Sequence, residues 1–121
     1  MATPQAALKK MREICLSLPD SREGEHFGQS AFRAGGRMFA SCGFKDGTCR
    51  IVVQLEAARV KRLLSSDPRF RRYPLAPNCV ELAAEDVRSW SEVRDLVRES
   101  YRLNVPAKAR PRRPARAKTG R

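Results

Sequence analysis

The sequence predicts an α+β domain in which an antiparallel β-meander carries helices on one face. Three observations lead to this fold class. Apolar residues recur at helical spacing near both ends of the folded part. Two dipeptides, Gly35-Gly36 and Asp46-Gly47, divide short extended runs as hairpin loops do. The order of patterns along the chain is helix, extended segments, helix, extended segment, helix, and an antiparallel sheet with helices over one face accommodates this order most simply.

The first helix is expected over residues 4–17. Thr3 supplies a side-chain N-cap, Pro4 suits the first helical position, and apolar residues follow at helical spacing. Pro19 ends the helix, because proline disfavours helical backbone in the residue before it. The polar segment SREGEHFGQ, residues 21–29, is expected to be a connection into the strands.

Two hairpins follow, with Gly35-Gly36 and Asp46-Gly47 as their two-residue loops, because these residues suit positive φ angles. The first loop places Phe32 opposite Phe39 as an aromatic cross-strand pair. Strand alternation then divides the side chains between two faces. The face expected to form the core carries Met38, Ala40, Cys42, Phe44, Cys49, Ile51 and Val53, and the other face carries Phe32, Arg37, Phe39, Ser41, Arg50 and Val52.

The second half of the chain is expected to contain two helices, a loop and a short strand. A helix over residues 56–64 is closed by Asp67-Pro68, PRFRRYPLAP at 68–77 reads as a proline-bounded loop, and residues 79–82 alternate as a strand. Ser89-x-x-Glu92 has the spacing of a capping box at the start of the last helix. The apolar stripe of this helix consists of Trp90, Val93, Leu96, Val97, Tyr101 and Leu103.

Composition predicts one folded domain, residues 1–105, followed by a basic tail, residues 106–121. The 121 residues carry a formal net charge of +12, with 41% hydrophobic and 31% charged residues, and this length supports one core. The tail has seven Lys or Arg and no acid. Its alternating Ala, Pro and basic residues cannot bury apolar surface, so it is expected to be disordered. No stretch has the hydrophobicity of a signal peptide or a membrane span, so we expect a cytosolic protein without membrane association.

The cysteines and glycines indicate neither a metal nor a cofactor. Cys15, Cys42, Cys49 and Cys79 form no C-x-x-C pair, and the chain has a single histidine, so neither a zinc site nor a disulfide framework is indicated. We expect four buried, reduced thiols. Gly35-Gly36 lacks the strand-turn-helix context of a phosphate-binding loop. The expected cofactor is therefore none.

One cluster, Glu23, Glu25 and His26, has residue types that serve in acid/base catalysis, because a carboxylate can orient an imidazole and tune its pKa. The chain offers no second histidine, and neither a Gly-x-Ser-x-Gly nor a Cys-His-Asn pattern accompanies this cluster. A structural or surface role for His26 is therefore favoured, and we expect a protein without enzymatic activity.

Basic residues beside aromatic ones make nucleic acid the favoured partner, because clustered positive charge gains from counterion release. One sheet face would combine base-stacking rings with phosphate-neutralising arginines, unless a helix covers that face. Residues 69–73 either follow a phosphate backbone or form a solvated loop whose Phe70 and Tyr73 enter the core. The tail either holds nucleic acid electrostatically or only maintains solubility, and the first reading is favoured. The candidate nucleic-acid-binding residues are Arg37, Phe39, Arg50, Arg69, Arg71, Arg72, Tyr73, Lys108, Arg110, Arg112, Arg113, Arg116 and Lys118.

Two segments resemble the MmcQ/YjbR family of small bacterial proteins, namely LPDSREGEHFGQSAFRAGGRMFASCGF at 18–44 and VRDLVRESYRLNVPAK at 93–108. The similar features are the Leu18-Pro19 end of the first helix, the Phe27-Gly28 step before a phenylalanine-rich hairpin, and Ser100-Tyr101 in the closing helix. The resemblance implies a double-wing, CyaY-like α+β fold and a DNA-binding role, and it transfers no catalytic residue.

Together these features predict a non-enzymatic, cytosolic DNA-binding protein of unknown oligomeric state. The alternative function is a protein-interaction or small-ligand-binding module whose contact surface is the Phe32/Phe39 face of the sheet.

Overall fold

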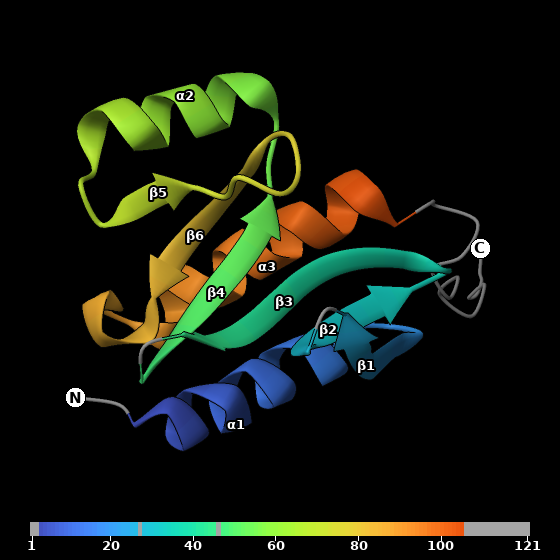
Figure 1. The fold of residues 1–121 in the computed structure, drawn as a ribbon. Helices are drawn as coiled ribbons and strands as arrows, with labels where there is room; N and C mark the ends of the chain where they lie inside the picture. The colour runs from blue at the N-terminus through green and yellow to red at the C-terminus, as the bar shows by residue number, and fades with distance from the viewer. Residues whose placement is uncertain (1–2, 27, 46, 106–121) are drawn as a thin grey trace.

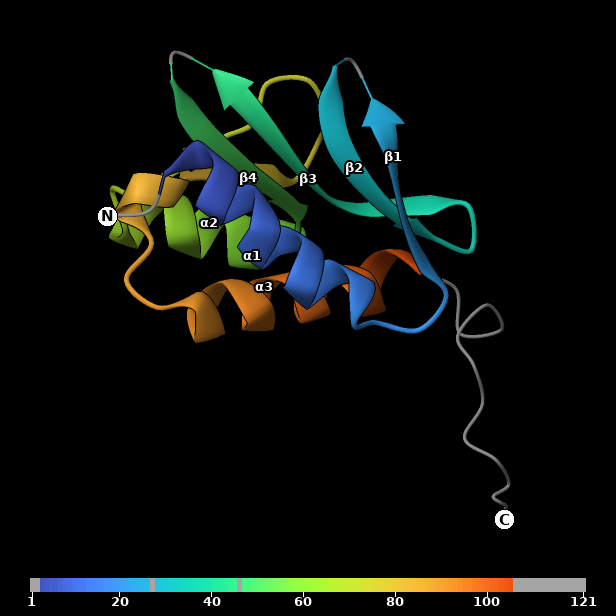
Figure 2. The same ribbon diagram turned by 90° about the horizontal axis from the view of Figure 1, so that it is seen from below.

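The computed structural model describes residues 3–26, 28–45 and 47–105 and contains an antiparallel six-stranded sheet with helices α1 and α3 side by side on one face (Figures 1 and 2). The strand order is β1-β2-β3-β4-β6-β5. The predicted α+β class is therefore confirmed. The elements are α1 (Pro4–Leu16), β1 (Ser21–His26), β2 (Gln29–Ala34), β3 (Arg37–Lys45), β4 (Thr48–Gln54), α2 (Ala57–Ser66), β5 (Phe70–Arg72), β6 (Cys79–Ala83), a short 3-10 helix (Ala84–Asp86) and α3 (Trp90–Asn104).

The three predicted helices are confirmed, and α1 and α3 carry their predicted N-caps. The Ala6 backbone N–H donates to Thr3 Oγ1 at 3.0 Å at the start of α1, and the Ser91 backbone N–H donates to Ser89 Oγ at 3.2 Å at the start of α3. Within the α3 stripe, Leu103 departs from the prediction, since its side chain is 44% exposed. Within the helix, the buried stripe ends two residues earlier, at Tyr101.

Two strands lie where the sequence predicts loops. Residues 21–26, predicted as a polar connection, form β1, and residues 70–72, predicted as part of a loop, form β5. Both are the edge strands of the sheet. An edge strand can leave most of its side chains in water, as β1 does, so it lacks the apolar alternation by which a strand is predicted.

The first hairpin contains a β-bulge at Phe39. The Gly35-Gly36 loop is confirmed, with positive φ angles of 59° and 78°. Beyond it, the register shifts between Phe32 and Arg33, so that Phe32 pairs with Ala40. The predicted pairing of Phe32 with Phe39 is therefore wrong, because Phe39 is the extra residue that the bulge inserts into β3.

The bulge brings both phenylalanines into the core. Phe32 is 0% and Phe39 is 1% exposed, and the Phe39 ring meets the Tyr101 ring of α3 edge-on at 5.2 Å. Phe44, predicted to be in the core, is instead 54% exposed near the second hairpin loop. The exposed Phe32/Phe39 surface expected for an interaction module does not exist in this fold.

Ser100 fastens α3 to the bulge. Its hydroxyl donates to the Phe39 carbonyl at 2.6 Å and accepts from the Gln54 backbone N–H at 3.1 Å. The Asn104 side-chain amide donates to the same hydroxyl at 3.2 Å. Ser100 is fully buried, so this network satisfies polar groups that have no access to water.

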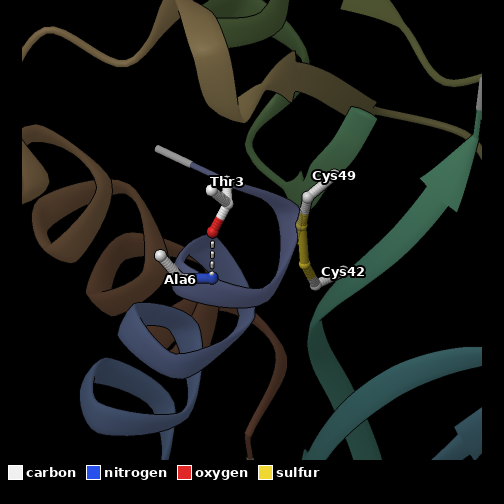
Figure 3. Close-up of a disulfide and its surroundings, with 4 residues drawn as sticks. All are labelled: Thr3, Ala6, Cys42 and Cys49. Atoms are coloured by element: carbon white, nitrogen blue, oxygen red, sulfur yellow. Dashed lines mark hydrogen bonds between the residues drawn. A yellow bond between two sulfur atoms is a disulfide. The ribbon is translucent and has the colours of Figure 1, made fainter. Parts of the chain in front are cut away.

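The second hairpin contains a disulfide between Cys42 and Cys49. The predicted register is confirmed, with Cys42 opposite Ile51 and Phe44 opposite Cys49. The two cysteines are therefore diagonal neighbours on the core face, with 6.2 Å between their Cα atoms, a separation that a disulfide spans. The prediction of reduced thiols is wrong for this pair and confirmed for Cys15 and Cys79, which are buried and free. Figure 3 shows the disulfide beside the first turn of α1.

Replacement of Ser100 by Ala is expected to destabilise the domain by about 1–3 kcal/mol, because it leaves the Phe39 carbonyl and the Gln54 N–H buried without a partner. Urea unfolding measures this change. Ser65→Ala is the matched control, since the Ser65 hydroxyl is exposed and bonds only the Arg62 carbonyl of its own helix among the described residues. Equal, small effects of the two substitutions would contradict the role given to Ser100.

Reduction of the disulfide is expected to lower the free energy of unfolding by about 2–4 kcal/mol, because the Cys42–Cys49 bridge restricts the unfolded chain. Urea unfolding with and without dithiothreitol measures the loss. The double variant Cys42→Ser/Cys49→Ser is expected to unfold identically in both buffers. Cys15→Ser/Cys79→Ser provides the comparison in which the response to dithiothreitol persists.

Candidate nucleic-acid interface

The predicted aromatic and basic surface of Arg37, Phe39 and Arg50 is not formed. Phe39 is in the core, and the Arg37 side chain is exposed beside the Gly35-Gly36 loop. Arg50 lies opposite Gly43, which is six residues further along β3 than Arg37, or about 20 Å at strand spacing. The prediction that these three residues share one contact face is therefore wrong. The bulge turns the Phe39 side chain into the core, and the length of β3 separates the two arginines.

Arg69 holds three elements together rather than presenting its charge to solvent. Its guanidinium donates to Asp67 at 2.8 Å and to Glu92 at 2.7 Å, and its side chain is 12% exposed. These contacts join the end of α2, the start of β5 and the first turn of α3. Hydrogen bonds from Arg69 lower the pKa of both carboxyl groups. Glu92, predicted as a capping-box residue, thus pairs with Arg69 instead.

The other residues of the predicted basic-aromatic loop separate onto different surfaces. Phe70 is 5% exposed and belongs to the core, in agreement with the alternative in which Phe70 enters the core. Arg71 and Arg72 are exposed, but as neighbours in β5 they point to opposite faces of the sheet. The Tyr73 backbone N–H donates to the Cys79 carbonyl at 2.9 Å and its side chain is half-buried. Arg69 and Arg71 line one depression together with Arg50, but Glu81, Glu85 and Asp86 line it as well. Arg72 points to the other face, so the three arginines of the loop do not form one phosphate-binding cluster.

The remaining candidates belong to residues 106–121 and lie outside the described residues. They are Lys108, Arg110, Arg112, Arg113, Arg116 and Lys118. The prediction that this tail is disordered concerns the same residues and stays a prediction.

Three arginines of α3 form a basic row that the sequence analysis did not single out. Arg94, Arg98 and Arg102, the α3 arginine row, are all exposed. Residues four apart lie on one side of a helix and about 6 Å apart along its axis. The row ends three residues before the basic segment 106–121 begins. Its signal was present in the sequence as the four-residue spacing in VRDLVRESYRLN, within a helix that was correctly predicted.

The acidic residues of α3 lie mainly on a different flank from the row, where partners neutralise them. Glu92 pairs with Arg69, and Glu99 lies 3.4 Å from Arg59 of α2. Asp95 lies next to the row, with its carboxylate 3.5 Å from the Arg94 guanidinium and its side chain 70% exposed. An exposed pair of this kind contributes little binding energy and competes weakly with a phosphate. The Arg94–Asp95 pair is therefore a small obstacle to phosphate binding by Arg94.

The possible acid/base cluster at the end of β1 is dispersed by the strand. Glu23 accepts two hydrogen bonds from Arg12 of α1, at 2.8 and 3.0 Å, and these lower its pKa. Strand alternation directs Glu23 and Glu25 to the face opposite His26. His26 Nδ1 lies 3.5 Å from Arg33 of β2. The three residues do not form a catalytic geometry.

Residues 3–26, 28–45 and 47–105 contain neither a candidate metal-ion cluster nor a helix that could span a membrane. No group of three His, Cys, Asp or Glu side chains in this part of the chain is arranged to hold a metal ion. None of its helices combines the length and the apolar character that a membrane span requires. The expected lack of metal and cofactor stays a prediction.

Comparisons with known proteins give one family and one fold. The family model YjbR matches residues 16–103. The crystal structure of Deinococcus radiodurans protein DR2400, with the domain DUF419, is similar with a TM-score of 0.72 and 23% identity, over 96% of this chain and 90% of that one. No curated protein matches this chain. At this identity the likeness to DR2400 concerns the fold.

Replacement of Glu92 by Gln is expected to lower stability at neutral pH and to weaken its dependence on acid. Arg69 lowers the pKa of Glu92, so the pair stabilises the fold above the usual carboxyl pKa of about 4 and loses this effect as pH falls through the lowered value. The difference in melting temperature between wild type and variant should therefore be largest near neutral pH and shrink towards about pH 3. Asp95→Asn, on the exposed side of α3, should leave the acid dependence unchanged. Parallel curves for wild type and Glu92→Gln would contradict the assignment.

Proposed function

The chain belongs to the YjbR family, and from this premise we propose that it is a non-enzymatic DNA-binding protein that contacts the phosphate backbone through the α3 arginine row and the basic segment 106–121. The observation that carries the proposal is the position of this row, exposed along α3 and continuous in sequence with seven further basic residues. Family membership by itself names no partner.

The charge of the row is suited to phosphates rather than to bases. Three guanidinium groups on one helix side extend over about 12 Å, since eight residues rise by 1.5 Å each. Arginine binds phosphate oxygens in a bidentate manner and stays charged at any physiological pH. α3 is held against the sheet by its apolar stripe, and the arginines reach outward from it. Contacts of this kind supply affinity without sequence selection.

The body and the tail have separate parts in this proposal. The folded domain gives a rigid row of charges whose geometry is set by α3, and the tail adds seven charges to the affinity. Because each phosphate contact releases counterions, both parts should show in the salt dependence of binding. A cytosolic location belongs to the same proposal, because DNA is then accessible.

The triple variant Arg94→Gln/Arg98→Gln/Arg102→Gln is expected to lose DNA binding most clearly in a chain that ends at Val105. Val105 is kept because its side chain is buried. Fluorescence anisotropy with labelled duplex DNA, at about 50 and about 200 mM salt, measures the affinity. The slope of log affinity against log salt should fall by up to about 0.9 for each phosphate contact removed.

The control removes three exposed charges elsewhere, in Arg22→Gln/Lys61→Gln/Arg62→Gln. This variant should bind DNA with a smaller loss than the α3 variant. Absence of binding by the full-length chain at low salt would refute the function, and equal losses in both triple variants would refute the assignment to α3.

A further inference from the structure

The sheet face opposite α1 and α3 carries a groove that has no part in the proposed DNA binding. The segment 73–78, between β5 and β6, lies on this side of the sheet (Figure 2, yellow loop). Ser41 of β3 and Val52 of β4 pair across this face. They are only 4% and 7% exposed, although α1 and α3 lie on the other side. The segment therefore acts as a strap that shields the middle of the sheet.

Two depressions border the strap and share Val52. One, of about 200 Å³, is largely apolar and is lined by Met38, Val52, Pro77 and Cys79, among others. The other, of about 190 Å³, is lined by Gln29, Gly43, Arg50 and Tyr73, among others. Together they reach the lower end of the range of small-molecule sites, about 300–1,000 Å³. A largely apolar depression thus adjoins one that also carries polar side chains, which is called the polar depression below.

Gly43 keeps the polar depression open. A Cβ atom built at this position would lie 2.6 Å from the Gln29 side chain, so any larger residue would displace that side chain. Gln29 remains on the depression floor, and its amide can donate to or accept from a ligand.

Arg50 and Glu81 are the charged groups that line the polar depression, and the hydrogen-bonding capacity of Arg50 is incompletely used. Its Nε is buried and has no partner among the described residues. Its Nη1 lies 3.5 Å from Glu81 Oε1, at the limit of a hydrogen bond. Glu81 is also directly opposite Arg71 in the β5–β6 ladder, so a second arginine lies beside the same carboxylate. A partly buried guanidinium in this state favours an added anion.

We propose that the groove under the strap binds a small carboxylic acid with an apolar body. The carboxylate accepts hydrogen bonds from the Arg50 guanidinium, and the hydrocarbon part lies against Met38, Val52 and Pro77. A fully polar acid would leave the apolar depression empty, and a neutral hydrocarbon would give the Arg50 Nε–H no acceptor, so the combination of both features selects the ligand class.

Hexanoate is the probe, and an NMR titration of the full-length, isotope-labelled protein is the test. Saturable shifts are expected for backbone amides around the groove, such as those of Gly43, Val52 and Ala76, with a dissociation constant on the order of a millimolar. Acetate, which has no apolar body, and 1-hexanol, which has no charge, should each bind at least about tenfold more weakly. Absence of saturable shifts with hexanoate, or equal binding of hexanol, would overturn the proposal.

The variant Arg50→Gln distinguishes the contribution of the Arg50 charge to hexanoate binding from the contribution of the apolar depression. It should weaken hexanoate at least about tenfold, to the level of hexanol, and leave hexanol binding unchanged. Arg22→Gln, on the exposed strand β1, should leave both affinities unchanged. If Arg50→Gln does not fold, the comparison of hexanoate with hexanol on the wild-type protein still decides. Unchanged hexanoate binding by a folded Arg50→Gln protein would overturn the proposal.

Discussion

The β-bulge at Phe39, fastened by Ser100, is the constraint on which the arrangement of this domain depends. In a regular hairpin Phe32 and Phe39 would share one face of the sheet and Ala40 would lie on the other, so the two rings and Ala40 could not all join one core. The extra residue lets both Phe32 and Phe39 join the core, where each buried ring contributes about 1.5–3 kcal/mol. At the bulge, the Phe39 carbonyl accepts a hydrogen bond from the Ser100 hydroxyl of α3. The same bulge therefore supplies aromatic side chains to the core and the carbonyl to which α3 is bonded.

The docking of α3 in turn decides which basic residues hold the fold and which face solvent. With Val93, Val97 and Tyr101 turned to the core, the flank of Glu92 and Glu99 faces α2 and β5, where Arg69 and Arg59 pair with it. The arginine row then points outward by helical geometry alone. Arg69 belongs to the densest basic stretch of the folded sequence, and yet its guanidinium pairs with Asp67 and Glu92 of the same domain. Charge density along a sequence thus does not measure charge density on a surface.

The features that the sequence predicts correctly are those encoded by neighbouring residues. The caps at Thr3 and Ser89, the Gly35-Gly36 loop and the helical stripes each depend on a few positions with a known spacing. The features missed are decided by distant contacts. The bulge in β3 is bonded by the distant Ser100, and the edge strands obtain their pairing from β2 and β6. The Cys42–Cys49 bridge differs, since the correctly predicted hairpin register already makes the two cysteines diagonal neighbours on one face. For the candidate site, the same limit applies, since exposure of Phe39 and Arg69 is set by α3, whereas the spacing of the α3 arginines could be read directly.

The two proposed surfaces differ in how strongly salt affects them. Exposed charges such as those of the α3 row interact over distances comparable to the Debye length, which is about 8 Å at physiological ionic strength, so added salt weakens them. Arg50 is 24% exposed and lies beneath the strap, where an ion pair is screened much less. The sheet separates these surfaces, with α3 on one side and the strap on the other. If both proposals hold, a ligand in the groove would bind under salt conditions in which the row releases DNA, so the two proposed activities would be separable in one protein.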